Sequence, residues 1–249
     1  MGVMRELFQI IHEDDDLLVV NKPSDLVCHP TKTDEYSSLI SRVRLHVGKD
    51  SHPHLVNRLD RETSGVTVVA KNDTAARELR RLWESREVQK DYLAIVEGNV
   101  SCQHGTIDTP LGKDLKSKVA IKDCARPNGA PAQTEYWVER RFERTPEDAS
   151  VTGRFTLLRV RPLTGRKHQI RIHLAHVGHP IVGDKLYGGD EDLYLALVES
   201  RLTEEQRKRL ILPNHALHAA RVQFLWRGSL HEFQAEPEKW FVDFLCEFS

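Results

Sequence analysis

A carboxylate between two arginines is the first group in the sequence that could do chemistry. Asp60 lies between Arg58 and Arg61, within a polar stretch at 57–65 that leads into an apolar run. Nearby positive charge and hydrogen bonds favour the ionised form of a carboxyl group, so we expect Asp60 to be charged at neutral pH. That state suits a nucleophile better than a general acid. The same residue types are also common in surface turns, so this stretch alone leaves both interpretations open.

A second polar segment, at 163–173, combines a glycine with a group of cations. Gly165 precedes Arg166, Lys167 and His168. Backbone N–H groups at the start of a helix and nearby side-chain cations can bind phosphate together, so the segment predicts an anion site. Four histidines in and after this segment also suggest a metal, but their spacings match no metal-site pattern, and we expect no metal. These histidines are His168, His173, His176 and His179.

The hydrophobic pattern predicts the elements that must position these groups. A hairpin is expected over 7–11 and 17–21, a buried strand over 66–70, and an amphipathic helix over 75–83 with capping candidates at 72–74. Further strands are expected over 92–96, 135–139 and 155–160. The segment 164–177 alternates ambiguously, and we predict a helix that Thr164 caps and that ends before Gly178. The predicted class is α+β, with a mixed and mostly antiparallel sheet, flanking helices and a central active-site cleft.

Composition excludes several classes of protein. The chain has 249 residues, of which 39% are hydrophobic and 29% charged, with a formal net charge of -1. These values exclude disordered and collagen-like chains. No apolar run is long enough to span a membrane and no secretory signal is visible, so we expect a cytoplasmic protein. The four cysteines form no Cys-x-x-Cys pair and are expected to be reduced.

The organisation of the chain predicts one continuous domain over residues 1–249. No repeat or Gly/Ser linker divides the sequence. Charge is unevenly distributed, because the stretches 113–126 and 154–185 are both rich in Lys and Arg. The sequence therefore predicts a basic face on a nearly neutral protein, although solvated surfaces would explain the charge alone.

Several motifs in order resemble the RluA-type family of pseudouridine synthases. The principal matches are Asn21-Lys22-Pro23 with His29-Pro30, Arg58-Leu59-Asp60 with Thr63-Ser64-Gly65, and Thr164-Gly165-Arg166 through His173 with His179-Pro180-Ile181 and Gly183-Asp184. Residues 90–94, 96–98 and 217–219 resemble further signatures of the family, and the similarity runs from about residue 6 to 242. This resemblance implies a pseudouridine-synthase-like domain and an isomerase that converts uridine in RNA to pseudouridine without a cofactor or metal.

The resemblance also implies roles for particular residues. Asp60 would be the essential aspartate, acting at C1' of the ribose as nucleophile or as base and charge stabiliser. Arg166 would pair with it, with Arg171 as the rival for that role. Tyr92 would lie against the uracil ring, and Arg58 would fill the gap left by the flipped nucleotide. The residues expected to bind RNA are Arg58, Arg61, Lys167, His168 and Arg171.

Two departures from the family pattern affect the expected substrate. Asn57 stands where the family usually has His, and the predicted hairpin begins too early to leave room for an S4 RNA-binding domain. We therefore expect a monomer whose catalytic domain alone binds a tRNA or rRNA stem-loop, with affinity that falls as salt rises.

Three other functions are alternatives to an RNA uridine isomerase. A non-catalytic RNA-binding protein of the same fold is the main alternative, and intact Asp60, Tyr92 and Arg166 argue against it. A glycoside hydrolase using Asp60 and Glu62 is disfavoured, because carboxylates two residues apart in an extended loop point to opposite sides. A metal-dependent hydrolase built on the histidines is the third.

Overall fold

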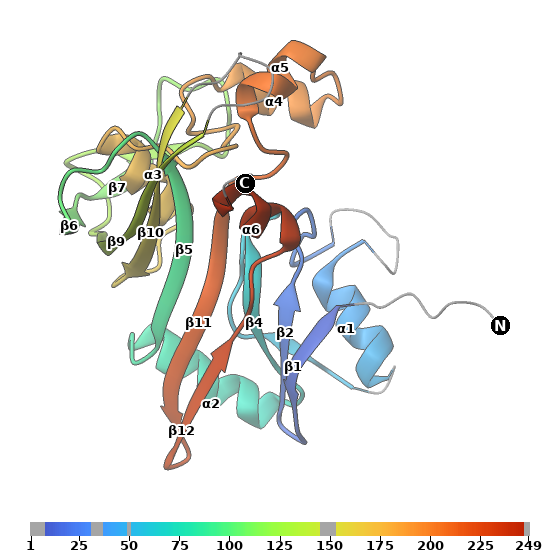
Figure 1. The fold of residues 1–249 in the computed structure, drawn as a ribbon. Coiled ribbons are helices and arrows are strands. Elements are labelled where there is room, and N and C mark those ends of the chain that lie inside the picture. The colour runs from blue at the N-terminus through green and yellow to red at the C-terminus, as the bar shows by residue number, and fades with distance from the viewer. Residues whose placement is uncertain (1–7, 31–36, 49–50, 145–152, 247–249) are drawn as a thin grey trace. The chain divides into compact units, whose positions relative to one another are not determined.

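A computed structural model describes residues 8–30, 37–48, 51–144 and 153–246. Its internal contacts divide the chain into two compact units, which are described separately below. The first unit comprises residues 1–90 and 218–245, and the second comprises residues 91–217 and 246–249. Figure 1 labels the helices and strands of both units. The expectation of one continuous domain stays a prediction.

The first unit is built on a row of four neighbouring strands. In order they are β1 (Gln9–Glu13), β2 (Leu17–Lys22), β4 (Ser64–Ala70) and β11 (Leu217–Trp226), the last of which begins one residue earlier in the second unit. The short β3 (His54–Leu55) pairs with β4, and β12 (Ser229–Gln234) pairs with β11. β4 and β11 are parallel, and the other pairs are antiparallel.

The predicted hairpin is confirmed as β1 and β2. Asp14 shapes its turn, because its Oδ1 accepts hydrogen bonds from the amides of Asp16 at 2.8 Å and Leu17 at 2.7 Å. The first strand starts at Gln9, two residues later than expected, and Leu7 lies outside the described residues.

Helices cover both faces of this unit's strands. β4 is buried along its whole length, as expected for a strand with a layer on each side. α1 (Leu39–Val47) contributes Leu39 and Val43 to one apolar cluster, which also contains Val69 of β4. α2 (Asp73–Glu84) contributes Leu79 to the other cluster, which contains Val68. A third helix, α6 (Lys239–Leu245), buries two phenylalanines.

The predicted amphipathic helix is confirmed as α2. Its N-cap is Asn72, whose side chain accepts a hydrogen bond from the amide of Ala75 at 3.0 Å. Ala75 and Leu79 of the predicted apolar face are buried, and Leu82 and Trp83 are half-buried against the same cluster.

The second unit contains four neighbouring antiparallel strands and a small two-stranded arm. The four strands, in order, are β5 (Gln89–Glu97), β10 (Gly153–Pro162), β9 (Gln133–Arg144) and β6 (His104–Asp108), with the first two residues of β5 belonging to the first unit. The arm consists of β7 (Leu111–Lys113) and β8 (Asp123–Ala125). Its helices are α3 (Gln169–His176), α4 (Asp192–Val198) and α5 (Glu204–Leu210).

The predicted helix at 164–177 is confirmed only from Gln169 onward. Thr164 does not cap it, because its hydroxyl donates to Gln169 Oε1 at 2.7 Å instead, and His168 occupies the N-cap position without a capping side-chain bond. The end is as predicted, since Gly178 has φ of +86° and follows the last turn. The start of α3 thus has no side-chain cap, and the threonine bonds to a buried glutamine amide.

The described strands and helices confirm the α+β class with a mixed, mostly antiparallel arrangement. Within the described residues, no helix is both long enough and apolar enough to cross a membrane. The predicted central cleft stays a prediction.

We expect Gly65→Ala to destabilise the protein strongly. A Cβ at this position would lie 2.2 Å from the carbonyl oxygen of Ala219 on β11, and the backbone has φ of +113°. Overpacking and the strained backbone should together lower the free energy of unfolding by about 3 kcal/mol, measured by denaturant titration. Gly178→Ala is the matched control, because its φ is also positive but no atom lies within 4 Å of the added Cβ. Equal losses for the two variants would contradict the close-approach argument.

Candidate functional site

The Asp60 loop is held by a buried lysine. Lys22, at the end of β2, is 0% exposed, and its Nζ donates to the carbonyl oxygens of Pro23 at 2.7 Å, Leu26 at 2.8 Å and Arg61 at 3.1 Å. Three acceptors match the three N–H donors of an ammonium group. Burial lowers the pKa of Lys22 to about 8. Lys22 therefore anchors the backbone immediately after Asp60.

The residue before Asp60 is anchored by a cysteine. Cys28 Sγ accepts a hydrogen bond from the Leu59 amide at 3.4 Å, and its S–H lies 3.3 Å from the Leu59 carbonyl oxygen. Burial raises the pKa of the Cys28 thiol, which keeps the S–H donor in place. Both neighbours of Asp60 in the chain are thus fixed by buried side chains.

Two further contacts fix the ends of the loop. The Asn57 amide donates to the carbonyl oxygen of Val66 at 3.2 Å and accepts from the amide of Val68 at 2.8 Å, both on β4. At the other end, the Ser64 hydroxyl lies 2.9 Å from Nδ1 of His218, and His218 Nε2 lies 2.8 Å from the Ala235 carbonyl oxygen. Burial lowers the pKa of His218, so the ring is neutral and its Nδ1 accepts the hydroxyl proton.

The charged residues of the loop differ in exposure. Asp60 is half-buried and begins a turn that closes with a bond from the Thr63 amide to the Asp60 carbonyl oxygen at 3.2 Å. Arg58 and Arg61 are exposed, and Arg61 Nε donates to Asp25 at 2.7 Å. The first unit therefore presents one carboxylate between two accessible arginines on a rigid backbone.

In the second unit, Tyr92 lies on β5 opposite Val160 of β10 and is half-buried. Its neighbour Asp91 points to the other face, because side chains alternate along a strand. Asp91 accepts two hydrogen bonds from Arg161, at 2.8 and 3.2 Å. This bidentate pair fixes the strand next to Tyr92.

One buried amide, that of Gln169, organises the segment before α3. Its Oε1 accepts from the Thr164 hydroxyl at 2.7 Å and from the Arg166 amide at 3.0 Å. Its Nε2 donates to the Gln133 carbonyl oxygen and to the Thr134 hydroxyl, both at 2.9 Å. All four hydrogen-bonding positions of the amide are thereby used.

The cations of this segment have unequal access to a ligand. Arg166 is exposed and donates through Nε to the Pro131 carbonyl oxygen at 3.1 Å, and Lys167 is exposed beside Asp123 at 3.1 Å. His168 has φ of 54°, and its Nδ1 lies 2.9 Å from the Tyr187 hydroxyl. A left-handed conformation is uncommon for a residue other than glycine, and here the tyrosine holds it.

Arg171 is the least accessible of the predicted RNA-binding residues. It is 7% exposed and donates to both carboxylate oxygens of Asp184, at 2.7 and 2.9 Å. Burial alone would raise the pKa of Asp184, but the charge and hydrogen bonds of Arg171 hold it well below its usual range. The Arg171 guanidinium also lies 5.0 Å from the ring centroid of Tyr187.

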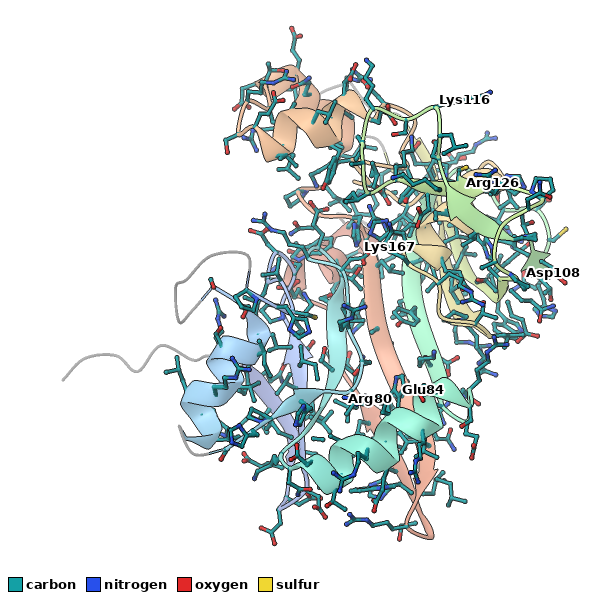
Figure 2. The ribbon with its side chains drawn as sticks, turned by 180° about the vertical axis from the view of Figure 1, so that it is seen from behind. Arg80, Glu84, Asp108, Lys116, Arg126 and Lys167 are labelled. Carbon is teal, nitrogen blue, oxygen red and sulfur yellow. The ribbon has the colours of Figure 1, made fainter. Side chains whose placement is uncertain are left out.

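The arm formed by β7 and β8 carries the basic stretch predicted from the sequence. The Lys116 amide donates to Asp114 at 3.0 Å, but its side-chain ammonium forms no ion pair among the described residues, and Arg126 donates to the Lys113 carbonyl oxygen at 3.0 Å. Figure 2 labels both side chains on this arm. Its basic residues are Lys113, Lys116, Lys118, Lys122 and Arg126, of which Lys122 is held by Glu191 at 2.8 Å.

The predicted site residues are divided between the two units. Asp60, Arg58 and Arg61 belong to the first, and the others to the second, so the pairing of Asp60 with Arg166 or Arg171 stays a prediction. Within the described ranges, no three His, Cys, Asp or Glu side chains gather as a possible metal site. Sequence reasoning missed the anchoring roles of Lys22, Cys28, His218 and Gln169, although all but Cys28 lie in the motifs quoted above.

Comparison with known proteins places this geometry in a family. Residues 16–176 match the family model described as RNA pseudouridylate synthase. The dual-specificity RNA pseudouridine synthase RluA of Escherichia coli is 40% identical over 183 residues, which are 73% of this chain and 78% of that protein. An uncharacterized RNA pseudouridine synthase of Aquifex aeolicus is also 40% identical, over 72% of this chain and 55% of the relative.

Other relatives are longer than this chain. The ribosomal large subunit pseudouridine synthase D of Haemophilus ducreyi is 36% identical over 72% of this chain and 52% of its own length. The chain thus spans about half the length of this relative and of the Aquifex protein.

Solved structures agree with the sequence comparison. Human RNA Pseudouridylate Synthase Domain Containing 4 is 28% identical, with a TM-score of 0.69 over 94% of this chain and 90% of that one. Human RNA Pseudouridylate Synthase Domain Containing 1, at 24% identity and a TM-score of 0.72 over 95% of this chain and 86% of that one, shares the fold. With a family match over most of the chain and a relative matched over most of its length, the chain belongs to the RNA pseudouridylate synthase family and has RluA-type relatives.

Proposed function

We propose that this chain isomerises uridine to pseudouridine in structured RNA. The reaction breaks the bond between C1' of the ribose and N1 of uracil, turns the base, and forms a bond from C1' to C5. The hydrogen on C5 leaves as a proton and N1, released from the ribose, gains a proton, so atoms and charge balance without an oxidant or reductant. The reaction needs one carboxylate at C1' and a base that has left the helical stack.

The anchoring of the Asp60 backbone carries this proposal. Cys28 fixes Leu59 and Lys22 fixes Arg61, so the residues on both sides of Asp60 are held by buried groups. Positioning of a reacting group lowers a barrier because the entropy of placing it is lost during folding. A turn that served only to connect strands would not need a buried ammonium on its backbone.

The other residues have roles that follow from their chemistry. Asp60 acts at C1', either as nucleophile or as base and charge stabiliser. Tyr92 supports the uracil ring with its face, and Arg166 pairs with Asp60 and holds its orientation. Arg58, exposed beside Asp60, occupies the space that the flipped nucleotide leaves.

RNA is bound by exposed cations of both units. Arg61 and Lys167 contact phosphates, and the half-buried His168 lies beside Lys167. Arg171, whose guanidinium is buried and bound to Asp184, supports this segment from within instead of contacting phosphate directly. The arm's Lys116 and Arg126 extend this contact. A tRNA, or a tRNA-like stem-loop of rRNA, is the proposed substrate, because a compact hairpin offers several phosphates to a small protein.

We expect tritium release from RNA carrying 5-tritiated uridine. Transcripts made without modifications, as separate tRNA and rRNA pools, should release tritium into water when C1' joins C5. Asp60→Asn should reduce the rate to about a thousandth or less, because the acting carboxylate is lost. Release should continue in chelator.

The same experiment separates the enzyme from a non-catalytic RNA-binding protein. Salt-dependent RNA binding without tritium release from any pool would overturn the proposed activity. Equal rates for wild type and Asp60→Asn would overturn the role of Asp60.

Activity should fall as pH rises above about 8, because Lys22 loses its proton near that value. A neutral amine has two N–H donors for three carbonyl oxygens, so the Arg61 anchor loosens. In the unfolded chain the pKa of Lys22 is the ordinary 10.5, so between about pH 8 and 10.5 the unfolded state binds the extra proton and the free energy of unfolding rises with pH. Activity and stability should therefore diverge.

Single-turnover rates and denaturant titrations from pH 6.5 to 9.5 would measure this divergence. The control variant is Lys22→Met, which has no ammonium group at this position. Its rate should be low at every pH, without the alkaline fall that Lys22 causes. An unchanged alkaline limb in Lys22→Met would assign the titration to another group.

Replacing Lys116 and Arg126 of the arm by Gln should weaken RNA binding and its salt dependence. Loss of two phosphate contacts reduces the slope of log affinity against log salt by about 1.5. The control is Arg201→Gln with Lys239→Gln, which removes the same charge from exposed residues that contact Glu199 and Asp243. Binding isotherms at several salt concentrations measure both. Equal slopes for the two double variants would exclude the arm from the RNA interface.

A further inference from the structure

The exposed side of α2 carries a row of arginines that the proposed chemistry does not use. Arg77, Arg80 and Arg81 are all exposed; Arg77 and Arg81 lie on the side of the helix away from its buried Ala75 and Leu79, and Arg80 lies at the edge of that side. Residues three and four apart are neighbours along a helix surface, so these three form one stripe. We call Arg77, Arg80 and Arg81 the α2 arginine stripe. Figure 2 labels Arg80 on this helix.

The stripe is not neutralised by acidic groups of the described chain. Arg77 donates only to the Thr74 hydroxyl, at 3.3 Å, and neither Arg80 nor Arg81 contacts an acid among the described residues. Glu78, which lies between these arginines in the sequence, has other partners: it binds Arg227 at 2.8 Å and Trp226 at 2.9 Å. Glu84 is exposed at the end of the helix, and it forms no ion pair with Arg80.

Helix stability does not explain this arrangement. Arginine is a good helix former, and a cation in the last turn interacts favourably with the helix dipole, which accounts for Arg81. Arg77 is the fifth of twelve residues and gains nothing from the dipole. Like charges three and four positions apart also destabilise a helix slightly. The stripe therefore calls for an anionic partner.

We propose that the α2 arginine stripe binds backbone phosphates of the RNA at a distance from the target uridine. The proposal rests on the proposed function. β4 begins just after the Asp60 loop and ends just before α2, and Figure 1 shows α2 beside that far end. At about 3.3 Å per residue, the seven residues of β4 separate its ends by roughly 20 Å. The stripe would thus contact a flank of the RNA, outside the loop that contains the flipped base.

Phosphate in RNA fits the stripe better than a lipid surface does. Arginine forks bind phosphate in bidentate fashion, and a short row along a helix can follow one strand of a nucleic acid. Helices that bind membranes combine cations with exposed apolar residues. Among the described residues, no large hydrophobic side chain of α2 is exposed.

The test compares a triple variant, R77Q/R80Q/R81Q, on two RNA hairpins of different length. Stems of about 5 and 25 base pairs reach roughly 14 and 70 Å at about 2.8 Å per base pair of A-form RNA, so only the long stem can extend the roughly 20 Å from Asp60 to the stripe. At about 0.1 M salt we expect the triple variant to bind the long hairpin about tenfold more weakly, with a salt slope smaller by about 2. Binding to the short hairpin should be unchanged.

Two controls separate this result from loss of folding or of overall charge. R201Q/R207Q/K239Q removes the same charge from exposed positions on other elements and should bind both hairpins as wild type does. The stripe variant should melt close to the wild-type temperature, because the loss of like-charge repulsion offsets the loss of the Arg81 interaction with the helix dipole.

Equal affinity of both triple variants for the long hairpin would overturn the proposal. The proposal would also be overturned if the stripe variant lost binding to phosphatidylserine vesicles, or to an acidic polypeptide, while its RNA binding stayed intact. Tritium release is measured on the same proteins. Absence of release from wild type would refute the proposed activity, while a length-dependent binding loss would still support the stripe.

Discussion

A buried ammonium group on the backbone of the Asp60 loop is the constraint on which the rest of the first unit depends. A charge taken out of water destabilises a protein unless hydrogen bonds replace its hydration. Lys22 meets this requirement with carbonyl oxygens from Pro23, Leu26 and Arg61. The chain after β2 and the loop before β4 must therefore converge on one point. The position of Asp60 is a consequence of that convergence.

The second unit uses buried polar groups in the same way, and this determines which cations remain for a ligand. The Gln169 amide makes the hydrogen bonds that fix the segment before α3, and the Asp184 carboxylate binds the Arg171 guanidinium through both oxygens. The exposed Arg166 and Lys167 follow directly on this rigid support. Cations that complete internal networks are buried, and those on the outside are available to phosphate. Arg227 is exposed like the α2 arginine stripe but differs from it in being held by two acids, Glu78 and Asp16.

The local sequence pattern was sufficient to predict much of the fold. Periodicity and capping residues predicted the first hairpin, β4 and α2, because these elements bury one face or both and are closed by residues nearby in sequence. The predicted start of α3 was wrong for two reasons. Its apolar residues fit both a strand period and a helix period, and Thr164 bonds to a glutamine amide instead of capping the helix.

The anchors of the site could not be predicted from pattern. Lys22 and Arg61 are 39 residues apart, and Ser64 and His218 are 154 residues apart. Such contacts depend on which strands become neighbours, and local sequence does not encode that. The resemblance identified the motifs that contain most of these residues, but the tasks of the individual side chains emerged only from their hydrogen bonds.

Asn57 joins the Asp60 loop to β4 through a group that does not titrate. Its amide offers one donor to Val66 and one acceptor to Val68. A neutral histidine also has one donor and one acceptor, but it loses the acceptor when it gains a proton. An amide keeps both at any acidity. In this protein the hydrogen bonds between the Asp60 loop and β4 are therefore permanent and not proton-sensitive.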